Sequence, residues 1–395
     1  MRVTGRPAYV PRSEESWRDP FGMYAALREH DPVHHVDDGD YWVLSRYDDV
    51  AAAALDTETY SSAQGLTFSY GELAAAGLDE ISPMVFLDPP DHSAFRRLVV
   101  RGFTPRQVTG LEPDIREFCA ERIDRLRETG GGDIVAALFK PLPSFVVGRY
   151  LGVPDVDRER FDAWTRGIVS ANALGDPLLA GHTVAELFAY FTELIEWRRA
   201  DPADDVVSEL VQAADGDALS AMRILGFTFT MVTGGNDTTT GLLGGATELL
   251  HADPDQRARL TGDPALIPDA VEELLRLTSP VQGLARTVTR DVELHGAVIP
   301  AGRKVMLLYA AANRDPREFG PDAEELDVTR RPARVLSFGL GAHHCLGAAA
   351  ARLMARVAVE ELLRRCPEFV VDAAAGRFAP GHFVRRFDSL PFSPR

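Results

Sequence analysis

The longest apolar stretch of the chain runs from residue 224 to residue 250, and it constrains the fold more than any other feature. By its length alone, this segment could span a membrane as a helix. A charged residue inside it, Asp237, argues against that interpretation, as do several threonines and the glycines at positions 234, 235, 244 and 245. We therefore expect one long helix that passes through the middle of a protein core.

Helical patterns dominate the rest of the chain, and residues 114–277 are predicted to form mostly helices separated by Gly, Pro and Asp breaks. Short β signals at residues 32–36 and 41–45 flank a turn and predict a hairpin. Further strands are expected across residues 292–299 and 305–308. The sequence thus predicts a mainly α protein with a minor β region, folded as a single large domain over residues 1–395 around the long central helix.

Composition and charge limit the classes of function. The chain has 395 residues, 45% hydrophobic and 26% charged, as in globular proteins. Its formal net charge of −17 argues against general nucleic-acid binding. Three cysteines give no disulfide framework, and residues 1–20 contain neither a signal-peptide core nor an anchor helix. We therefore expect a cytoplasmic protein with no membrane anchor. The basic residues are almost all arginine and alanines are many, which suggests a bacterial origin.

The expected central helix contains the run Gly-Gly-Asn-Asp-Thr-Thr, from Gly234 to Thr239. Two glycines inside a helix cost about 1 kcal/mol each relative to alanine, so a compensating role is expected. The Thr238 hydroxyl can bond back to the carbonyl of Gly234, which bends the helix and opens a groove. An acid beside a hydroxyl, as in Asp237 and Thr238, could relay protons there. A helix N-cap or close helix packing is the structural alternative.

A second motif, from Phe338 to Gly347, contains Cys345 and precedes an amphipathic helical pattern. A thiolate on a glycine-rich loop at a helix N-terminus is a good soft ligand for iron, because the helix dipole and free N–H groups lower the thiol pKa. Glycines in the loop allow tight turns and close approach to a flat ligand, and His343 could donate to an anion. The glycines concerned are Gly339, Gly341 and Gly347.

Other roles for Cys345 are possible from the residues alone. A lone cysteine is most often a small buried hydrophobic residue. A zinc site would need further ligands at short spacing, and only Cys119 and Cys366 are available as other cysteines. A nucleophilic cysteine would need a His and an Asn or Asp partner, which sequence order does not exclude.

The pattern Phe-Gly-x-Gly-x-His-x-Cys-x-Gly resembles the haem-binding signature of cytochromes P450 at every fixed position. The chain is similar to soluble actinobacterial members of that family. The resemblance implies the cytochrome P450 fold and a haem b cofactor whose iron is bound by the Cys345 thiolate, with Phe338, Gly339 and Gly347 beside it. The run from Gly234 to Thr238 resembles the oxygen-binding motif of the family. That implies that Asp237 and Thr238 deliver protons during oxygen activation.

Two further motifs match the family in the expected order. Glu273 and Arg276 lie three residues apart on a predicted helix, and alone they would form an exposed ion pair worth less than about 1 kcal/mol. They resemble the structural Glu-x-x-Arg pair of the family, with Arg330 as a third member. The remaining matches are the haem-propionate partners, which the resemblance assigns as follows: His92, Arg96, Arg286 and His343. His92 and Arg96 are four residues apart and can face one anion.

The resemblance implies a monooxygenase that inserts one oxygen atom from O2 into a hydrophobic small molecule, by hydroxylation, dealkylation or epoxidation. Electrons would come from a ferredoxin or flavodoxin-type donor and its NAD(P)H-dependent reductase. A basic face over the cysteine side, formed by Arg97, Arg101, Arg352 and Arg356, would bind that donor. The family places the substrate pocket at Met231, Gly234, Val281, Leu284 and Phe383. Glycine at positions 234 and 283 would either leave extra room over the haem or simply relax the packing. The family also places pocket loops between residues 60 and 86 and between residues 168 and 179.

Two other functions are retained as alternatives. A peroxide-driven peroxygenase of the same fold would replace the acid–threonine pair with residues that bind a substrate carboxylate. A haem-binding carrier or sensor would bind the cofactor without turnover. Asp237 and Thr238 disfavour both, while the substrate and its site of oxidation stay open.

Overall fold

The computed structural model describes residues 7–75, 83–103, 105–174, 181–213 and 218–395. The helices are α1 (Phe21–His30), α2 (Tyr47–Leu55), α3 (Glu72–Ala75), α4 (Asp91–Val99), α5 (Pro105–Gly110), α6 (Glu112–Glu128), α7 (Pro141–Tyr150), α8 (Arg158–Leu174), α9 (Gly181–Ala200), α10 (Val206–Ala213), α11 (Ala218–Ala252), α12 (Pro254–Gly262), α13 (Ile267–Thr278), α14 (Tyr309–Ala312), α15 (Pro316–Phe319) and α16 (Ala348–Arg365). The strands are β1 (Val33–Val36), β2 (Tyr41–Leu44), β3 (Tyr60–Ser61), β4 (Gly132–Asp133), β5 (Leu284–Val288), β6 (Val292–Leu294), β7 (Ala297–Ile299), β8 (Lys304–Leu307), β9 (Val370–Val371), β10 (Arg377–Phe378), β11 (Phe387–Ser389) and β12 (Pro391–Ser393). The helix-rich prediction with a minor β portion is confirmed.

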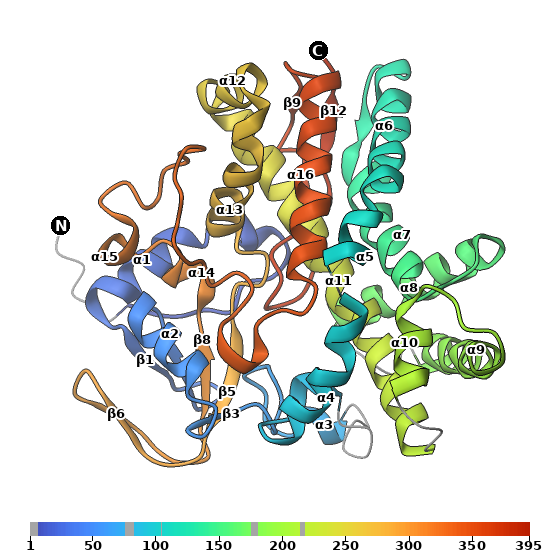
Figure 1. Ribbon diagram of the computed structural model, residues 1–395. Helices are drawn as coiled ribbons and strands as arrows, with labels where there is room; N and C mark the ends of the chain where they lie inside the picture. Colours follow the sequence, from blue (N-terminus) through green and yellow to red (C-terminus); the bar gives the residue numbers. More distant parts are fainter. Residues whose placement is uncertain (1–6, 76–82, 104, 175–180, 214–217) are drawn as a thin grey trace.

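The predicted long helix is α11, which has 35 residues and crosses the middle of the molecule behind α16 (Figure 1). It packs against α7, α8, α13 and α16, so its apolar side chains are covered on several faces. Leu242, Leu243, Ala246 and Leu250 are all buried. None of the helices in the described part of the chain is both long and apolar enough to cross a membrane.

The main sheet lies on one side of the molecule, with α1 and α2 and away from α6 to α10, whereas β9 and β12 lie beside α16 and α6 (Figure 1). The main sheet has the order β1-β2-β8-β5-β3. The predicted hairpin is present as the antiparallel pair β1–β2, with Val33 opposite Leu44. Strand β2 pairs in parallel with β8, and β5 pairs antiparallel with both β8 and β3. The second predicted strand group forms the β6–β7 hairpin and β8.

Two smaller sheets hold the C-terminal segment against the helices. Strand β10 pairs with β11, and β12 lies between β4 and β9. The β11 side of this segment packs directly on α11, where a Cβ on Gly241 would come within 2.6 Å of the Arg385 carbonyl oxygen. A Cβ on Gly244 would contact the Phe387 ring at 3.3 Å. These glycines of the central helix therefore serve close packing.

Candidate active site

A cavity of about 380 Å³ lies beside α11 and collects most of the site residues expected from the sequence. Its walls come from α4, α7, α11, β5, the loop before α16 and the loop before β11. The expected residues that line it are His92, Arg96, Met231, Gly234, Asp237, Thr238, Val281, Leu284, Arg286, Phe338, Gly339, His343, Cys345, Gly347 and Phe383. Residues separated by most of the chain thus face a single space.

The cysteine loop is held in a tight turn just before α16. The Cys345 amide donates to the Phe338 carbonyl at 2.8 Å, and Gly339 and Gly341 each have φ of +66°. That conformation favours glycine, as the sequence predicted for both positions. Gly347 differs, because its φ of −81° is accessible to other residues and a Cβ there would lie 3.9 Å from the sulfur in ordinary contact. The prediction that the backbone conformation at position 347 requires glycine is therefore wrong.

Burial dominates the acidity of the Cys345 thiol. The side chain is accessible from the cavity but lies deep inside the molecule, and this burial raises the pKa of the Cys345 thiol. The Gly347 N–H bonds to the sulfur and lowers the pKa, as do the charges of Arg96 and Arg352, but these effects are smaller. The lowering effect that the sequence predicts for the loop N–H is thus present, but in the protein alone burial outweighs it. A metal ion deprotonates a coordinating thiol outright.

Four basic side chains meet at one edge of the cavity. His92 and Arg286 are almost fully buried, at 1% and 5% exposed, and the rings of His92 and His343 lie 4.2 Å apart. Nδ1 of His92 is buried and has no hydrogen-bond partner among the described residues. Within the same residues, neither Arg96 nor Arg286 forms an ion pair with a carboxylate. Buried cations without counter-charges are costly, so this cluster is suited to bind an anion.

The histidine pKa values agree with that electrostatic environment. The pKa of His343 is lowered to about 3, mainly by burial, with Arg286, His92 and Arg96 acting in the same direction. Burial also lowers the pKa of His92, with a contribution from Arg96. Both rings are thus held neutral by the protein alone. Each can donate one N–H to an anion.

On the α11 side, the helix turns its small residues and its acid–alcohol pair toward the cavity. The Thr238 hydroxyl donates to the Gly234 carbonyl at 2.9 Å, the bond expected from the sequence. A Cβ on Gly234 would meet nothing within 4 Å, so this position borders open space. Burial raises the pKa of Asp237 to about 6, against the lowering effects of Arg386 and Lys140. Asp237 therefore titrates close to neutral pH.

The sequence interpretation missed Arg386, whose Nε lies 2.7 Å from Oδ1 of Asp237. Arg386 is 5% exposed and lines the cavity. The only signal in the sequence was its place three residues after Phe383, which was expected in the pocket. Its pairing with Asp237 depends on how the C-terminal segment packs on α11.

The apolar wall contains the expected pocket residues and brings two distant segments together. The Gln282 amide donates to the Phe383 carbonyl at 2.7 Å, and Val281 forms an isolated bridge with Val384. Leu66, Met84 and Val85, from the predicted 60–86 region, also line the cavity, while residues 76–82 lie outside the described part. In the predicted 168–179 region, Ile168 is buried in the core and residues 175–179 lie outside the described part.

Gly283 does not enlarge the cavity. A Cβ at this position would come within 2.6 Å of the Leu307 carbonyl oxygen and 3.0 Å of the Met306 sulfur. The glycine allows the chain to pack against β8 where β5 begins. The suggestion of extra room at Gly283 is therefore wrong.

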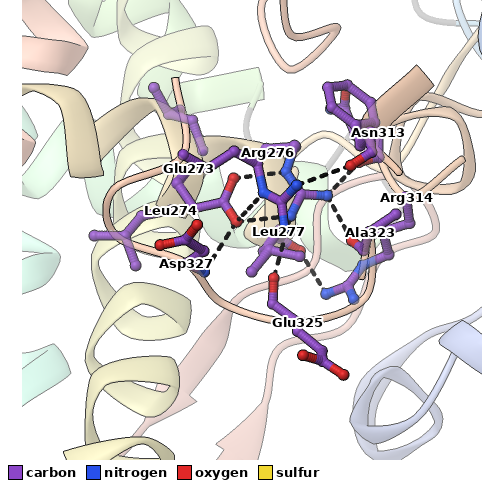
Figure 2. Close-up of polar contacts among 12 residues, drawn as sticks. Glu273, Leu274, Arg276, Leu277, Asn313, Arg314, Ala323, Glu325 and Asp327 are labelled. Atoms are coloured by element: carbon purple, nitrogen blue, oxygen red, sulfur yellow. Dashed lines mark hydrogen bonds and ion pairs between the residues drawn. The ribbon is translucent and has the colours of Figure 1, made fainter. Parts of the chain in front are cut away.

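Glu273 and Arg276 lie away from the cavity in a closed polar cluster (Figure 2). Both side chains are fully buried, and Arg276 Nε and Nη2 donate to the two carboxylate oxygens of Glu273 at 2.7 Å. The other donors of Arg276 bond to the carbonyls of Asn313, Ala323 and Glu325. Arg330 joins through a 3.2 Å contact to Glu273. The alternative of an exposed ion pair is excluded by this burial.

The arginines expected on the cysteine side are only partly available. Arg352 forms a two-point ion pair with Glu272 and stacks 4.6 Å from the Phe338 ring centre. Arg356 pairs with Glu112 and Glu360. Arg97 is exposed and forms no ion pair among the described residues. The side chain of Arg101 lies outside the described part. Ion pairs with carboxylates thus neutralise part of the positive charge of the predicted basic face.

Comparison with known proteins identifies the family. Residues 265–372 match the family described as Cytochrome P450. The chain is 60% identical over 387 residues to Cytochrome P450 130 of Mycobacterium tuberculosis, with 96% of each protein covered. It is 37% identical over 376 residues to the Vitamin D(3) 25-hydroxylase of Pseudonocardia autotrophica, covering 94% of this chain and 92% of that protein. The chain belongs to the cytochrome P450 family.

The fold agrees with this assignment. The structure of Cytochrome P450 CYP109Q5 from Chondromyces apiculatus matches with a TM-score of 0.87 at 34% identity, covering 96% of both chains. The protein is accordingly an oxidoreductase of the cytochrome P450 monooxygenase class. The family implies a haem cofactor with cysteine thiolate ligation. The cavity residues fit that cofactor, because one wall presents a cysteine sulfur and one edge presents buried donors without an anion.

Proposed function

We propose that Cys345 binds the iron of haem b and that His92, Arg96, Arg286 and His343 bind the haem propionates. The cavity-facing sulfur and the buried basic cluster support this assignment. Arginine donates in a fixed fork that suits carboxylates, and the two neutral histidines add single donors. A dianion at this edge would offset the burial cost of the two arginines.

The enzyme inserts one oxygen atom from O2 into a hydrophobic small molecule. When bound, a thiolate-ligated haem supplies oxygen activation and favours O–O cleavage. Asp237 supplies a proton from α11, since its pKa of about 6 lets it hold and release a proton in mildly acidic to neutral solution. Thr238 stands next to it with its own proton committed to the Gly234 carbonyl, so its oxygen is free to accept a hydrogen bond.

The substrate binds to the apolar wall of the cavity. Met231, Val281, Leu284 and Phe383 offer hydrophobic surface, and Gly234 leaves open space above the helix. These side chains orient an apolar molecule and exclude water from the reacting bond.

Electrons come from a ferredoxin or flavodoxin-type donor that docks on the cysteine side, where Arg97 is exposed and unpaired among the described residues.

A peroxygenase or a non-catalytic carrier fits less well. A peroxygenase of this fold needs a free cation near the oxygen-binding wall to hold a substrate carboxylate. The arginine at that wall, Arg386, is already paired with Asp237. A carrier has no use for an acid that titrates near neutrality beside an open cavity.

The observation that carries the proposal is that Cys345, from the loop before α16, and Asp237, from α11, line one cavity. It is tested by turnover of a ligand found by haem difference spectroscopy, with ferredoxin, reductase and NADPH. Asp237→Asn should reduce product formation about 100-fold and divert electrons to hydrogen peroxide. Wild-type product formation from hydrogen peroxide alone, with none from NADPH and a reducing partner, would instead indicate a peroxygenase.

A further inference from the structure

Four charged side chains of alternating sign connect the cavity to the protein surface. Asp237 pairs with Arg386 at 2.7 Å, and Nη1 of Arg386 also donates to Oδ1 of Asp388 at 3.5 Å. Lys140 Nζ donates to the same Asp388 oxygen at 2.6 Å and to the Asp388 carbonyl at 3.0 Å. Asp388 and Lys140 are 38% and 41% exposed, whereas Arg386 is 5% exposed. One guanidinium therefore bridges a cavity carboxylate and a surface carboxylate.

The local fold fixes Arg386 in this bridging place. Gly241 lies one helical turn after Asp237, and a side chain there would clash with the Arg385 carbonyl oxygen at 2.6 Å. The absence of that side chain allows the C-terminal segment to lie directly on α11. The Arg386 carbonyl accepts from the Ala379 amide at 3.0 Å, and the Arg385 amide donates to the Pro280 carbonyl at 2.9 Å. The backbone on both sides of the arginine is thus anchored.

We propose that Arg386 is a positioning residue that fixes the Asp237 carboxylate at the cavity wall, and that Asp388 and Lys140 anchor Arg386 from the protein surface. One proton leaves Asp237 for the cavity, and one proton from bulk water replaces it. Arg386 itself keeps all its protons, since a guanidinium is not deprotonated in proteins. Its role is to stabilise the carboxylate between the two transfers and to hold it at the cavity wall.

The charges that face Asp237 act on its acidity in opposite directions. Arg386 and Lys140 lower the pKa of Asp237, while Asp388 and burial raise it. Arg377 lies on the outer side of Asp388, at 3.8 Å, and is 70% exposed. Removal of Arg386 should therefore raise the pKa of Asp237, and removal of the Asp388 charge should lower it. Opposite shifts from two neighbouring residues would not follow from a merely structural role.

The first measurement is an infrared titration of the haem-loaded protein, which does not depend on turnover. The Asp237 band is the carboxyl signal that disappears in Asp237→Asn. In Arg386→Gln its midpoint should move up by about one pH unit, and in Asp388→Asn it should move down by about half a unit. Arg386→Lys, which keeps the charge, should restore a midpoint close to wild type. Arg377→Gln is the matched control and should leave the midpoint in place.

The second measurement is the pH profile of product formed per NADPH, and it rests on the proposed function. Product should decline as pH rises through the pKa of Asp237, because the acid form supplies the proton. The decline should move to higher pH in Arg386→Gln and to lower pH in Asp388→Asn. Equal loss at every pH in both variants, with unmoved infrared midpoints, would overturn the positioning role. Shifted infrared midpoints with no turnover in any variant would leave the role intact and refute the monooxygenase proposal.

Discussion

Two buried arginines in this protein, Arg276 and Arg286, differ in how many of their donors have a hydrogen-bond partner. Arg276 is fully buried, and its donors all bond to Glu273 or to backbone carbonyls (Figure 2). Arg286 is also buried, yet its only hydrogen bond among the described residues is to the carbonyl of the preceding Ala285, at 2.8 Å. Hydrogen-bond partners therefore separate an arginine that stabilises the fold from one that is available to bind a ligand. A satisfied cluster stabilises the fold by itself, whereas an unsatisfied one needs a ligand.

Burial alone would not have made that distinction. Arg276 and Arg286 are 0% and 5% exposed, and each lies within a regular element, α13 and β5. The number of hydrogen-bond partners distinguishes the two arginines, because an unpaired buried charge costs several kcal/mol of folding free energy and a paired one costs much less. The energetic consequences of the two surroundings can be measured separately, in the presence and absence of haem.

The largest effect is expected at Arg276. Arg276→Leu removes two donors from the buried Glu273 carboxylate, which keeps only the 3.2 Å contacts from Arg330 and the Asp327 amide, and it leaves three backbone carbonyls without their Arg276 donor. The unfolding free energy should therefore fall by about 3–5 kcal/mol. Urea unfolding of the haem-free protein measures this. Arg331→Leu is the matched control, because its pair with Asp269 is exposed and should be worth less than about 1 kcal/mol. Equal losses of stability in the two variants would show that the buried cluster around Arg276 contributes no more than an exposed ion pair.

Arg286→Leu should produce the reverse pattern. Removal of an unpaired buried cation should leave the stability of the haem-free protein unchanged or increase it, while haem dissociates at least about tenfold more readily. Haem transfer to an apoprotein acceptor measures the second quantity, and urea unfolding the first. A haem-free Arg286→Leu protein as unstable as Arg276→Leu would show that Arg286 is structural.

A smaller difference between an unpaired and a paired arginine is expected on the cysteine side, in the rate of reduction by the electron donor. Arg97 has no ion-pair partner among the described residues, while Arg352 is paired with Glu272. Arg97→Gln should slow reduction by a ferredoxin several-fold at low salt and lose that effect at high salt. Arg352→Gln should change the rate less. Stopped-flow reduction at two ionic strengths tests this, and identical rates for all three proteins would exclude a docking role for this face.

The sequence was most informative where a function depends on residues close together in the chain. The Cys345 loop and the Gly234–Thr238 run could each be interpreted locally, and the bond from Thr238 to Gly234 follows from helix geometry alone. The hairpin β1–β2 and the long helix α11 were likewise predictable from their patterns. These features need no knowledge of tertiary packing.

Other features depend on tertiary contacts that no local pattern encodes. The Asp237–Arg386 pair exists because Gly241 lets the C-terminal segment lie on α11. The pKa of Cys345 is raised because burial outweighs the Gly347 N–H bond, a balance that a loop motif does not reveal. Gly283 proved to be a packing position against β8 for the same reason.

The central claim, that Cys345 is the thiolate ligand of the haem, is tested most directly by the carbon-monoxide difference spectrum of the reduced protein. The wild type and Cys119→Ala should both give the thiolate-type band, because Cys119 is buried in the core on α6. Cys345→Ala should lose it. A thiolate-type band that survives in Cys345→Ala would show that Cys345 is not the ligand of the iron.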